Sequence, residues 1–475
     1  MWEPEAPARP SPALRAFLHI AGNSMNNPSS SLREHARAIW QAGVDAVRPE
    51  ILVPKALNEA EIRQALAGAP RILVLGGGKA GAAMSAALEA ALPDCLGKME
   101  GVVNVPAEVV RPLQAIQLHA ARTGRTNQPT SQGVAGARRI LALAQSAGPE
   151  DVGICLLSGG GSALLPAPAP GITLEDKQQV TLLLHACGAT INEMNAVRKH
   201  LSAIKGGRLA QAFSGKAFFS LIISDVIGDP LDVIASGPTA ADPGTFAEAL
   251  QILHRYQLDG KVPVAVLDYL QAGAAGQHPE TLKTLPAHVR NIVVGNNDTA
   301  LAAAQAKAEE LGYAVFNLGS AIAGETREVA TSMAPMIKSI AARGQPLPPP
   351  ACILSGGETT VTLTDNHGLG GRNQEFVLAM AARLGIAGLQ NVVVLAGGTD
   401  GEDGPTDAAG AIADVETLRN AGREGLDPGD FLDRHDAYHF FDPLGDLLRT
   451  GLTQTNVMDL RVILVGRPLS YQRNR

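Results

Sequence analysis

Cysteine, aromatic residues and positive charge are all scarce in this chain. Only four cysteines occur among 475 residues, too few and too scattered for a disulfide scaffold or a zinc site. The net charge is −7, whereas a general nucleic-acid binder would carry a basic excess. No run of about 18 consecutive apolar residues occurs, so we expect no membrane-spanning helix. These absences favour a cytoplasmic protein that binds neither nucleic acid nor membrane.

Glycine and apolar residues are plentiful instead. The chain has 51 glycines, with 45% apolar, 18% charged and only 4% aromatic residues, which is typical of a folded α/β enzyme with many tight turns. Its length is roughly three times that of a typical domain of about 150 residues, and we predict two domains. One is a Rossmann-like N-terminal domain over residues 25–285, and the other is a smaller C-terminal α/β domain over residues 286–475. The proline-rich residues 1–24 are expected to be a flexible extension.

Apolar runs alternate with segments of helical periodicity along the chain. In the N-terminal domain this pattern predicts strands at 71–75, 101–105, 151–157 and 218–223. Runs of this kind are typical of a mostly parallel sheet that helices cover on both faces. In the C-terminal domain, a strand at 291–294, a helix at 299–311 and a strand at 314–318 predict a compact βαβ unit. Further strands are predicted at 352–355, 392–396 and 460–465.

Four predicted strands end in glycine-rich loops. In parallel α/β sheets, ligands bind at the carboxyl ends of the strands, and glycine lets backbone N–H groups approach an anion. Turn geometry alone explains one such loop, but four of them favour a site for phosphate or another multiply charged anion. The residues expected to surround this anion are Gly77, Gly78, Ser158, Gly159, Gly160, Gly161, Ser162, Gly356 and Gly357.

Familiar nucleotide and hydrolase motifs are incomplete. Gly76-x-Gly78-x-x-Gly81 matches the dinucleotide fingerprint, but the next strand ends in Asn104-Val105-Pro106 without the acid that would hold a ribose. No Gly-Lys pair is followed by Ser or Thr, so a Walker A loop is missing. The G-x-S-x-G elbow is missing too, which disfavours a serine hydrolase.

Three basic positions are candidates for binding an anion. Lys79 follows three glycines where a helix is expected to begin, and a cation there is unfavourable for the helix dipole unless an anion binds nearby. Arg372 follows Gly370-Gly371 at the start of another predicted helix and suits a bidentate clamp on carboxylate or phosphate. Arg198 belongs to a basic cluster that fits a solvated helix face equally well.

Two acidic loops also follow predicted strands. Asp225 and Asp229 lie four residues apart, and Asp400, Glu402 and Asp403 form a second group. Such oxygen ligands in glycine-containing turns suit Mg²⁺, which needs only one or two protein carboxylates beside phosphate and water. Acids that cap helices and turns would give the same pattern.

Eight segments resemble the type II glycerate kinase family, whose members carry a C-terminal MOFRL domain. They occur in the order expected for that family and span nearly the whole chain from about residue 32. The segments are 76–80 (GGGKA), 156–168, 191–210, 223–239, 355–361 (SGGETTV), 370–375 (GGRNQE), 397–411 and 453–460 (TQTNVMDL). One departure is Gln454, which stands where the family usually has glycine in T-G-T-N-V.

The resemblance implies ATP-dependent phosphorylation of D-glycerate at its 2-hydroxyl, with Mg²⁺ or another divalent cation and an active site between two α/β domains. It places the lysine of the glycine loop at Lys79 and the clamp arginine at Arg372. Members of this family have also been named hydroxypyruvate reductase. An NAD(P)H-dependent reductase and a non-catalytic anion-binding protein therefore stay open as alternatives.

Residues and resemblance together give one set of expectations for the site. We expect Lys79, Arg372 and Asp225 to be catalytic, and Asp229, Glu358 and Asp400 to hold the metal. Arg198, Asn373 and Glu375 are expected to join the glycine loops in binding substrate or nucleotide. The expected small-molecule partners are ATP and D-glycerate, and a homodimer is left open.

Overall fold

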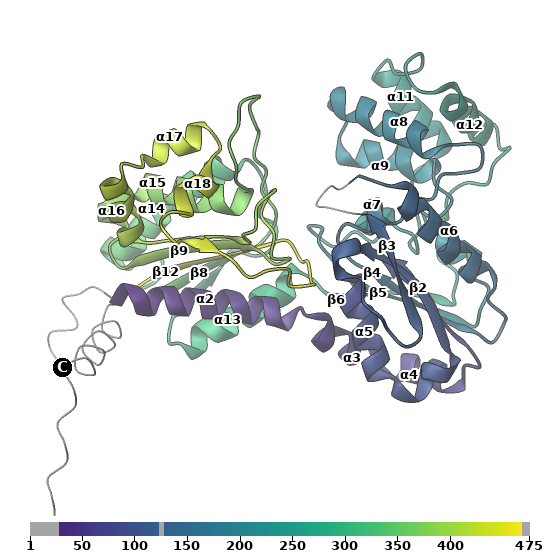
Figure 1. The fold of residues 1–475 in the computed structure, drawn as a ribbon, viewed down its shortest axis with the longest axis horizontal. Coiled ribbons are helices and arrows are strands. Elements are labelled where there is room, and N and C mark those ends of the chain that lie inside the picture. The colour runs from purple at the N-terminus through teal and green to yellow at the C-terminus, as the bar shows by residue number, and fades with distance from the viewer. Residues whose placement is uncertain (1–27, 123–127, 468–475) are drawn as a thin grey trace, which may run out of the picture.

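The chain forms two lobes, each built on a six-stranded sheet, in a computed structural model that describes residues 28–122 and 128–467 (Figure 1). The predicted flexible extension over residues 1–24 lies outside the described residues. The predicted α/β class is confirmed, because helices pack against both sheets. Among the helices of the described ranges, none is both long and apolar enough to cross a bilayer.

The sheet of the first lobe is entirely parallel, in the order β3-β2-β1-β4-β5-β6. Its central strands are apolar runs buried along their whole length, as expected for a parallel sheet covered on both faces. The chain builds outward from β1 in one direction and then from β4 in the other. The strands are β1 (Ile72–Gly77), β2 (Met99–Pro106), β3 (Ile116–Arg122), β4 (Val152–Leu157), β5 (Ala217–Ile223) and β6 (Val289–Gly295).

Helices of the first lobe form two covering layers and one separate bundle. One face of the sheet is covered by α3 (Pro49–Leu57), α4 (Ala60–Gly68) and α5 (Gly81–Ala91). The other face is covered by α6 (Ser131–Gln145) and α10 (Arg208–Ala212), with the short α7 (Gly161–Leu164) following β4. The bundle has its own apolar core and consists of α8 (Leu174–Ala186), α9 (Ile191–His200), α11 (Phe246–Arg255) and α12 (Val264–Ala274).

The sheet of the second lobe is mixed, in the order β11-β10-β9-β12-β8-β7. Only β7 and β8 pair in parallel, and the remaining pairs are antiparallel. The strands are β7 (Ala314–Asn317), β8 (Ala351–Ser355), β9 (Val392–Gly398), β10 (Gly410–Ala413), β11 (Leu447–Leu448) and β12 (Asp459–Val465). One face packs against α14 (Thr326–Arg343) and α15 (Arg372–Gly388), near α16 (Val415–Glu424), α17 (Pro428–Asp433) and α18 (Ala437–Phe441).

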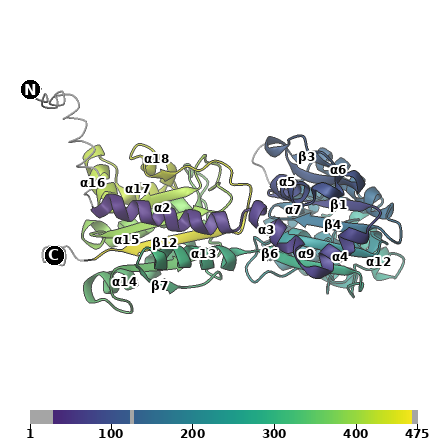
Figure 2. The same cartoon turned by 90° about the horizontal axis from the view of Figure 1, so that it is seen from below.

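The opposite face of this second sheet is covered from both halves of the chain. Helix α2 (Pro28–Ala46) packs against α13 (Asn297–Glu310) and against β9 and β12. Figure 2 shows α2, the first described helix, lying along the lobe that the C-terminal half builds. Trp40 of α2 is buried there and donates from Nε1 to the carbonyl of Gly397 at 3.2 Å. The two lobes are therefore tied together at the start of the chain as well as in its middle.

The predicted division at residue 286 does not coincide with the two sheets. Strand β6 pairs with β5 in the first sheet, although it lies beyond that boundary, and α2 packs on the second sheet. The predicted βαβ unit is wrong because β6 and β7 belong to different sheets and α13 runs between them. Local periodicity gives the elements but not the sheet that each one joins. The edge strand β3 was missed because polar residues interrupt its apolar pattern.

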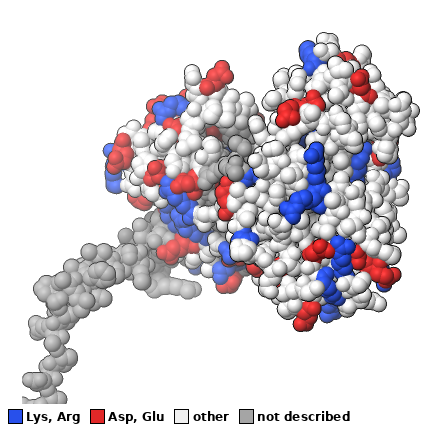
Figure 3. Space-filling model, turned by 45° about the vertical axis from the view of Figure 1, so that its right-hand side comes forward, with Lys and Arg blue, Asp and Glu red and all other residues white. Residues whose placement is uncertain are grey.

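Charged side chains are scattered over the surface. On the face drawn in Figure 3, most Lys and Arg lie in small groups close to Asp and Glu, one basic group stands apart in the middle of the right-hand lobe, and uncharged residues cover most of both lobes. This distribution agrees with the low content of charged residues in the sequence.

Candidate functional site

The loops after β1 and β4 meet where the strand order of the first sheet reverses. A Cβ atom on Gly76 would lie 2.0 Å from the carbonyl oxygen of Leu156, and one on Gly78 would lie 2.1 Å from Oγ of Ser158. The backbone N–H of Lys79 donates to the carbonyl of Gly159 at 2.8 Å, and that of Ala80 donates to Oγ of Ser158 at 3.0 Å. The glycines are thus needed for close packing of two loops at the position where open α/β sheets bind ligands.

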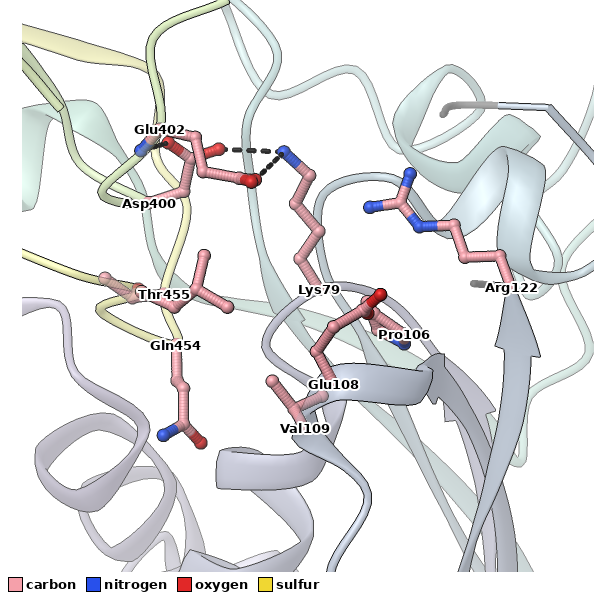
Figure 4. A pocket seen from close by; sticks show the side chains of 10 residues that line it. Lys79, Pro106, Glu108, Val109, Arg122, Asp400, Glu402, Gln454 and Thr455 are labelled. Carbon is pink, nitrogen blue, oxygen red and sulfur yellow. Dashed lines mark hydrogen bonds and ion pairs between the residues drawn. The ribbon is translucent and has the colours of Figure 1, made fainter. Parts of the chain in front are cut away.

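Lys79 reaches from this position to the second lobe. Its Nζ donates to Oδ2 of Asp400 at 2.8 Å and lies 3.4 Å from Oε2 of Glu402 (Figure 4). Burial lowers the pKa of Lys79, but the charges of Asp400 and Glu402 outweigh burial, so the net shift is upward. The sequence predicted that an anion binds beside this lysine; in this structure the counter-charge comes instead from two carboxylates of the other lobe.

Two cavities adjoin this ion pair and share Lys79, Arg122, Asp400 and Glu402 as lining residues. We call them together the interlobe crevice. The first has a volume of about 300 Å³ and its other lining residues include the apolar Pro106, Val109 and Leu452. The second has a volume of about 350 Å³ and adds Gly160, Asp225, Glu358, Arg372 and Asn456. One cavity is thus partly apolar and the other is lined mainly by charged and polar side chains.

Asp225 lies in the second cavity, directly after β5. Its Oδ2 accepts a hydrogen bond of 3.1 Å from Nδ2 of Asn456, which comes from the second lobe. Burial and the nearby charge of Glu358 raise the pKa of Asp225 to about 6, although Lys79 acts in the opposite direction. A Cβ atom on Gly159 would lie 2.3 Å from the Asp225 carboxylate, so a glycine is required beside it. Such a carboxyl can hold or release a proton near neutral pH.

Arg372 is the first residue of α15 and faces the same cavity. Its Nε donates to Oδ2 of Asp459 at 2.8 Å, and its Nη1 lies 2.9 Å from Oε1 of Glu358. Burial lowers the pKa of the guanidinium, but the two carboxylates outweigh burial and raise it above its ordinary value. Nδ2 of Asn373 also donates to Asp459, at 2.9 Å. Both predicted residues at the start of α15 are therefore fixed by one buried carboxylate.

Some predicted site residues lie apart from the interlobe crevice. Glu375 is buried inside the second lobe, where it accepts hydrogen bonds from Nε of Arg327 at 2.6 Å and contacts Nδ1 of His435 at 3.1 Å. A Cβ atom on Gly356 would lie 1.5 Å from Oδ1 of Asn297, and one on Gly357 would lie 2.3 Å from the carbonyl of Ile322. None of these three predicted residues lines either cavity. Their glycine or acid pattern serves packing in the second lobe.

The predicted metal ligands are not gathered in one cluster. Asp229 accepts from Nδ2 of Asn296 at 2.6 Å, Glu358 pairs with Arg372, and Asp400 pairs with Lys79. Throughout residues 28–122 and 128–467, no three His, Cys, Asp or Glu side chains form a group that could hold a metal ion. Each of the three predicted ligands thus has a different partner, and of the three only Glu358 and Asp400 line the second cavity.

The remaining predicted residues of the first lobe make contacts within that lobe. Oγ of Ser162 accepts hydrogen bonds from Nη2 of Arg198 and from Nζ of Lys205, each at 2.7 Å. A Cβ atom on Gly161 would lie 2.8 Å from Cβ of Ala235, and one on Gly77 would lie 3.0 Å from the Leu165 side chain. These two glycines allow close packing, whereas Ser162 and Arg198 form a polar contact beside the second cavity.

Several crevice residues were missed by sequence reasoning. Arg122 ends β3 and lines both cavities, and Figure 4 shows its guanidinium directed toward the space beside Lys79. Glu108 and Val109 come from the turn after β2. The signal for Arg122 would have been recognition of β3, since the end of a parallel strand beside β2 must lie at the same edge of the sheet. Asn456 could have been noticed next to Gln454, within TQTNVMDL.

Known proteins with similar sequences cover almost the whole chain. Residues 35–271 match a family described as a domain of unknown function, DUF4147, and residues 351–459 match the MOFRL family. A putative hydroxypyruvate reductase of Agrobacterium vitis is 42% identical over 92% of this chain and 95% of its own length. A glycerate 2-kinase of Pyrococcus horikoshii is 38% identical over 83% of this chain and 87% of its own length.

A solved structure agrees with the fold as well. The crystal structure of a glycerate kinase from Thermotoga maritima has a TM-score of 0.80 and 34% sequence identity, covering 92% of this chain and 99% of that chain. The two matching families, the similar sequences and the similar solved structure lead to the same conclusion. The chain belongs to the glycerate kinase family that combines a DUF4147 domain with a MOFRL domain.

Proposed function

We propose that this protein transfers a phosphoryl group from ATP to the 2-hydroxyl of D-glycerate, and that the interlobe crevice is its active site. The observation that carries the proposal is the meeting of Lys79 from the first lobe with Asp400 and Glu402 from the second, at a point where all three line two adjoining cavities. The Thermotoga maritima relative is a glycerate kinase by name, and the Pyrococcus horikoshii relative is named a glycerate 2-kinase, which supports the choice of hydroxyl group.

The two cavities differ in a way that suits two substrates. The apolar side chains of Pro106, Val109 and Leu452 in the first cavity suit the flat, apolar faces of a nucleotide base. The charged second cavity suits a small hydroxy acid. Lys79, which lines both, would then lie where the transferring phosphoryl group passes. Catalysis of phosphoryl transfer depends mainly on positioning the reactants and on neutralising the charge of the phosphoryl group. A lysine ammonium at this point can do both.

The acids and the second cation complete the proposed reaction. The 2-hydroxyl oxygen bonds to the γ-phosphorus as the bond to the bridging oxygen of ADP breaks, and Asp225 takes the hydroxyl proton. A pKa of about 6 keeps Asp225 mostly ionised at neutral pH and able to act as this base. Nε and Nη1 of Arg372 are held by Asp459 and Glu358. This fixes the guanidinium at the edge of the cavity, where it can stabilise the charge of the transition state.

The residues of the second cavity fit a magnesium ion that arrives with the nucleotide. Mg²⁺ needs only one or two protein carboxylates beside phosphate and water, and Glu358 and Asp400, two of the predicted metal ligands, line this cavity, which leaves Asp225 as the base. When bound, the ion would neutralise charge on the phosphates of ATP. Asp229 is left out of this proposal because it is bound to Asn296 away from the cavities.

A coupled assay tests the proposal. Purified protein with ATP, Mg²⁺ and D-glycerate should release ADP, and NMR of the product should show phosphate on the 2-position. NADH with hydroxypyruvate should give no oxidation. Product phosphorylated at the 3-position would overturn the regiochemistry, and no ADP release would overturn the kinase activity itself.

Hydroxypyruvate reduction is the second candidate, because the strand order of the first sheet is that of dinucleotide-binding folds and the Agrobacterium vitis relative carries this name. Asn104 stands near the end of β2, where an acid would hold the ribose. It is fully buried and donates to the carbonyls of Gly133 and Leu164 at 3.1 and 2.7 Å. A residue bound in this way is not available to a ribose, which favours the kinase.

A further inference from the structure

Basic side chains gather around the end of α9 in the first lobe, outside the set that lines the two cavities. They are Lys177, Arg198, Lys199, Lys205 and Arg208. The sequence left open whether this cluster is a solvated helix face, but Lys199 and Lys205 are only 3% and 2% exposed. A buried positive charge is costly unless a counter-charge or polar groups stabilise it. The partners of each cation therefore show what it does.

Three of these cations are explained by the fold. Nζ of Lys199 lies 2.9 Å from Asp232 and 3.1 Å from Asp242. Lys177 donates to the carbonyl of Leu201 at 2.8 Å. Nη1 of Arg208 donates to the carbonyls of Lys199 and Ser202 at 3.0 and 2.8 Å. These carbonyls end α9, where positive charge stabilises a helix.

The other two cations converge on one hydroxyl group. Nη2 of Arg198 and Nζ of Lys205 each lie 2.7 Å from Oγ of Ser162, and Lys205 also donates to the Ser162 carbonyl at 2.8 Å. In the part of the chain that the structure describes, neither cation forms an ion pair with a carboxylate. Burial and the neighbouring cations lower the pKa of Lys205 well below its ordinary value. An anion beside Ser162 would relieve this excess of positive charge.

The position of Ser162 relates this cluster to the interlobe crevice. Ser162 follows by two residues Gly160, which lines the second cavity but not the first. A Cβ atom on Gly160 would lie 3.3 Å from Cγ of Lys79, so this loop passes directly beside the lysine. Ser162 and Arg198 are partly exposed, and the buried Lys205 lies behind them. An anion bound here would therefore be on the acceptor side of Lys79.

We propose that Ser162, Arg198 and Lys205 bind the carboxylate of the hydroxy acid that receives the phosphoryl group. This assignment rests on the proposed function, because it takes the second cavity as the acceptor side. A guanidinium fork matches the two oxygens of a carboxylate, and the ammonium and hydroxyl groups add two more donors. Holding the carboxylate at this point leaves the hydroxyl end of the substrate free to face Lys79 and Asp225.

Substitution of Arg198 by methionine in the full-length protein tests the assignment. Arg198→Met keeps most of the side-chain volume and removes the charge. It should raise the KM for D-glycerate by about 10- to 100-fold, as expected for the loss of charged hydrogen bonds, while the KM for ATP stays within about twofold. Arg198→Lys should recover part of the loss. Arg255→Met is the matched control, because Arg255 is an exposed arginine of the same lobe that pairs with Glu193.

The outcomes separate this proposal from the proposed function. If the wild type phosphorylates D-glycerate but Arg198→Met keeps its KM for glycerate, the carboxylate site is wrong and the kinase activity stands. A rise in the KM for ATP instead would assign the cluster to a phosphate of the nucleotide and overturn the proposal. If Arg198→Met fails to fold, Ser162→Ala gives the same test, with a smaller rise of about 3- to 10-fold expected for one lost hydrogen bond.

Discussion

Two pairs of basic side chains in this protein differ in their partners: one pair is bound by carboxylates and the other is not. Lys79 and Arg372 line the interlobe crevice, and carboxylates hold each of them: Asp400 and Glu402 for Lys79, and Asp459 and Glu358 for Arg372. Arg198 and Lys205 lie beside the crevice and share only the hydroxyl of Ser162. The first pair is neutralised by the protein, whereas the second pair is left for a ligand to neutralise.

The presence or absence of carboxylate partners suggests that the two pairs have different roles in catalysis and substrate binding. A cation that already has carboxylate partners is held in one place, which suits a group that must stabilise charge appearing in a transition state. A cation without a carboxylate gains more from binding an anion in the ground state. We therefore expect changes at the first pair to act mainly on turnover and changes at the second pair to act mainly on substrate KM.

The largest effect should follow from removing the carboxylate-paired cations. Lys79→Ala and Arg372→Ala should each lower kcat at least about 10²-fold, as expected for the loss of a charge contact in the transition state. Steady-state kinetics with ATP and D-glycerate would measure this. Lys216→Ala is the control, since Lys216 forms an exposed ion pair with Glu150 on the first lobe. Near-normal turnover in both folded crevice variants would remove the distinction between the two pairs.

Asp225→Asn should separate activity from stability. In the folded protein the pKa of Asp225 is about 6, above its ordinary value of 3.8, so folding favours the protonated carboxyl. The ionised group therefore costs stability above pH 6, and this cost disappears as the pH falls toward 4. Asp225→Asn should accordingly raise the Tm at pH 8 and lose this advantage near pH 4, while kcat falls. In the wild type, kcat should rise between pH 5 and 7.

Differential scanning calorimetry of the wild type and Asp225→Asn at both pH values measures the stability effect, and taking the difference cancels groups that titrate alike in both proteins. The groups that face Asp225 are Asn456, Glu358, Lys79 and Asp400. An equal Tm difference at pH 4 and pH 8 would show that the carboxyl has no raised pKa in the folded protein.

Sequence reasoning succeeded where one strand and its loop determine the result. The apolar runs of β1, β4 and β5 predicted the parallel sheet, which the structure confirms, and Lys79 and Asp225 lie in the loops after β1 and β5, as predicted; their catalytic roles stay a prediction. It failed where two distant segments must meet. Nothing local shows that Asp400 reaches Lys79, that Asp459 holds Arg372, or that β6 and β7 join different sheets. Glu375 lies three residues after Arg372, a spacing that places two side chains on the same face of a helix. Its carboxylate nevertheless binds Arg327 and His435 inside the second lobe, two distant partners that the local pattern does not show.

The smallest effect concerns Gln454, on the loop that supports the carboxylates of the first pair. The N–H of the preceding residue, Thr453, donates to the carbonyl of Asp400 at 3.1 Å. Gln454 itself has a φ of 59°, and its buried Oε1 accepts no hydrogen bond within the described residues. Glycine adopts this left-handed conformation without strain, whereas other residues pay roughly 1 kcal/mol or more. The backbone therefore explains why glycine would fit here.

Gln454→Gly should stabilise the protein by about 0.5 kcal/mol, because relief of strain exceeds the entropy that glycine adds to the unfolded chain. Gln257→Gly is the matched control, since Gln257 has a φ of 55° and lies exposed in the first lobe. Both variants should unfold at slightly higher temperature, but only Gln454→Gly, which removes a side chain lining the first cavity, should raise the KM for ATP, by about 2- to 5-fold. An unchanged KM in Gln454→Gly would mean that the nucleotide does not contact this side of the first cavity.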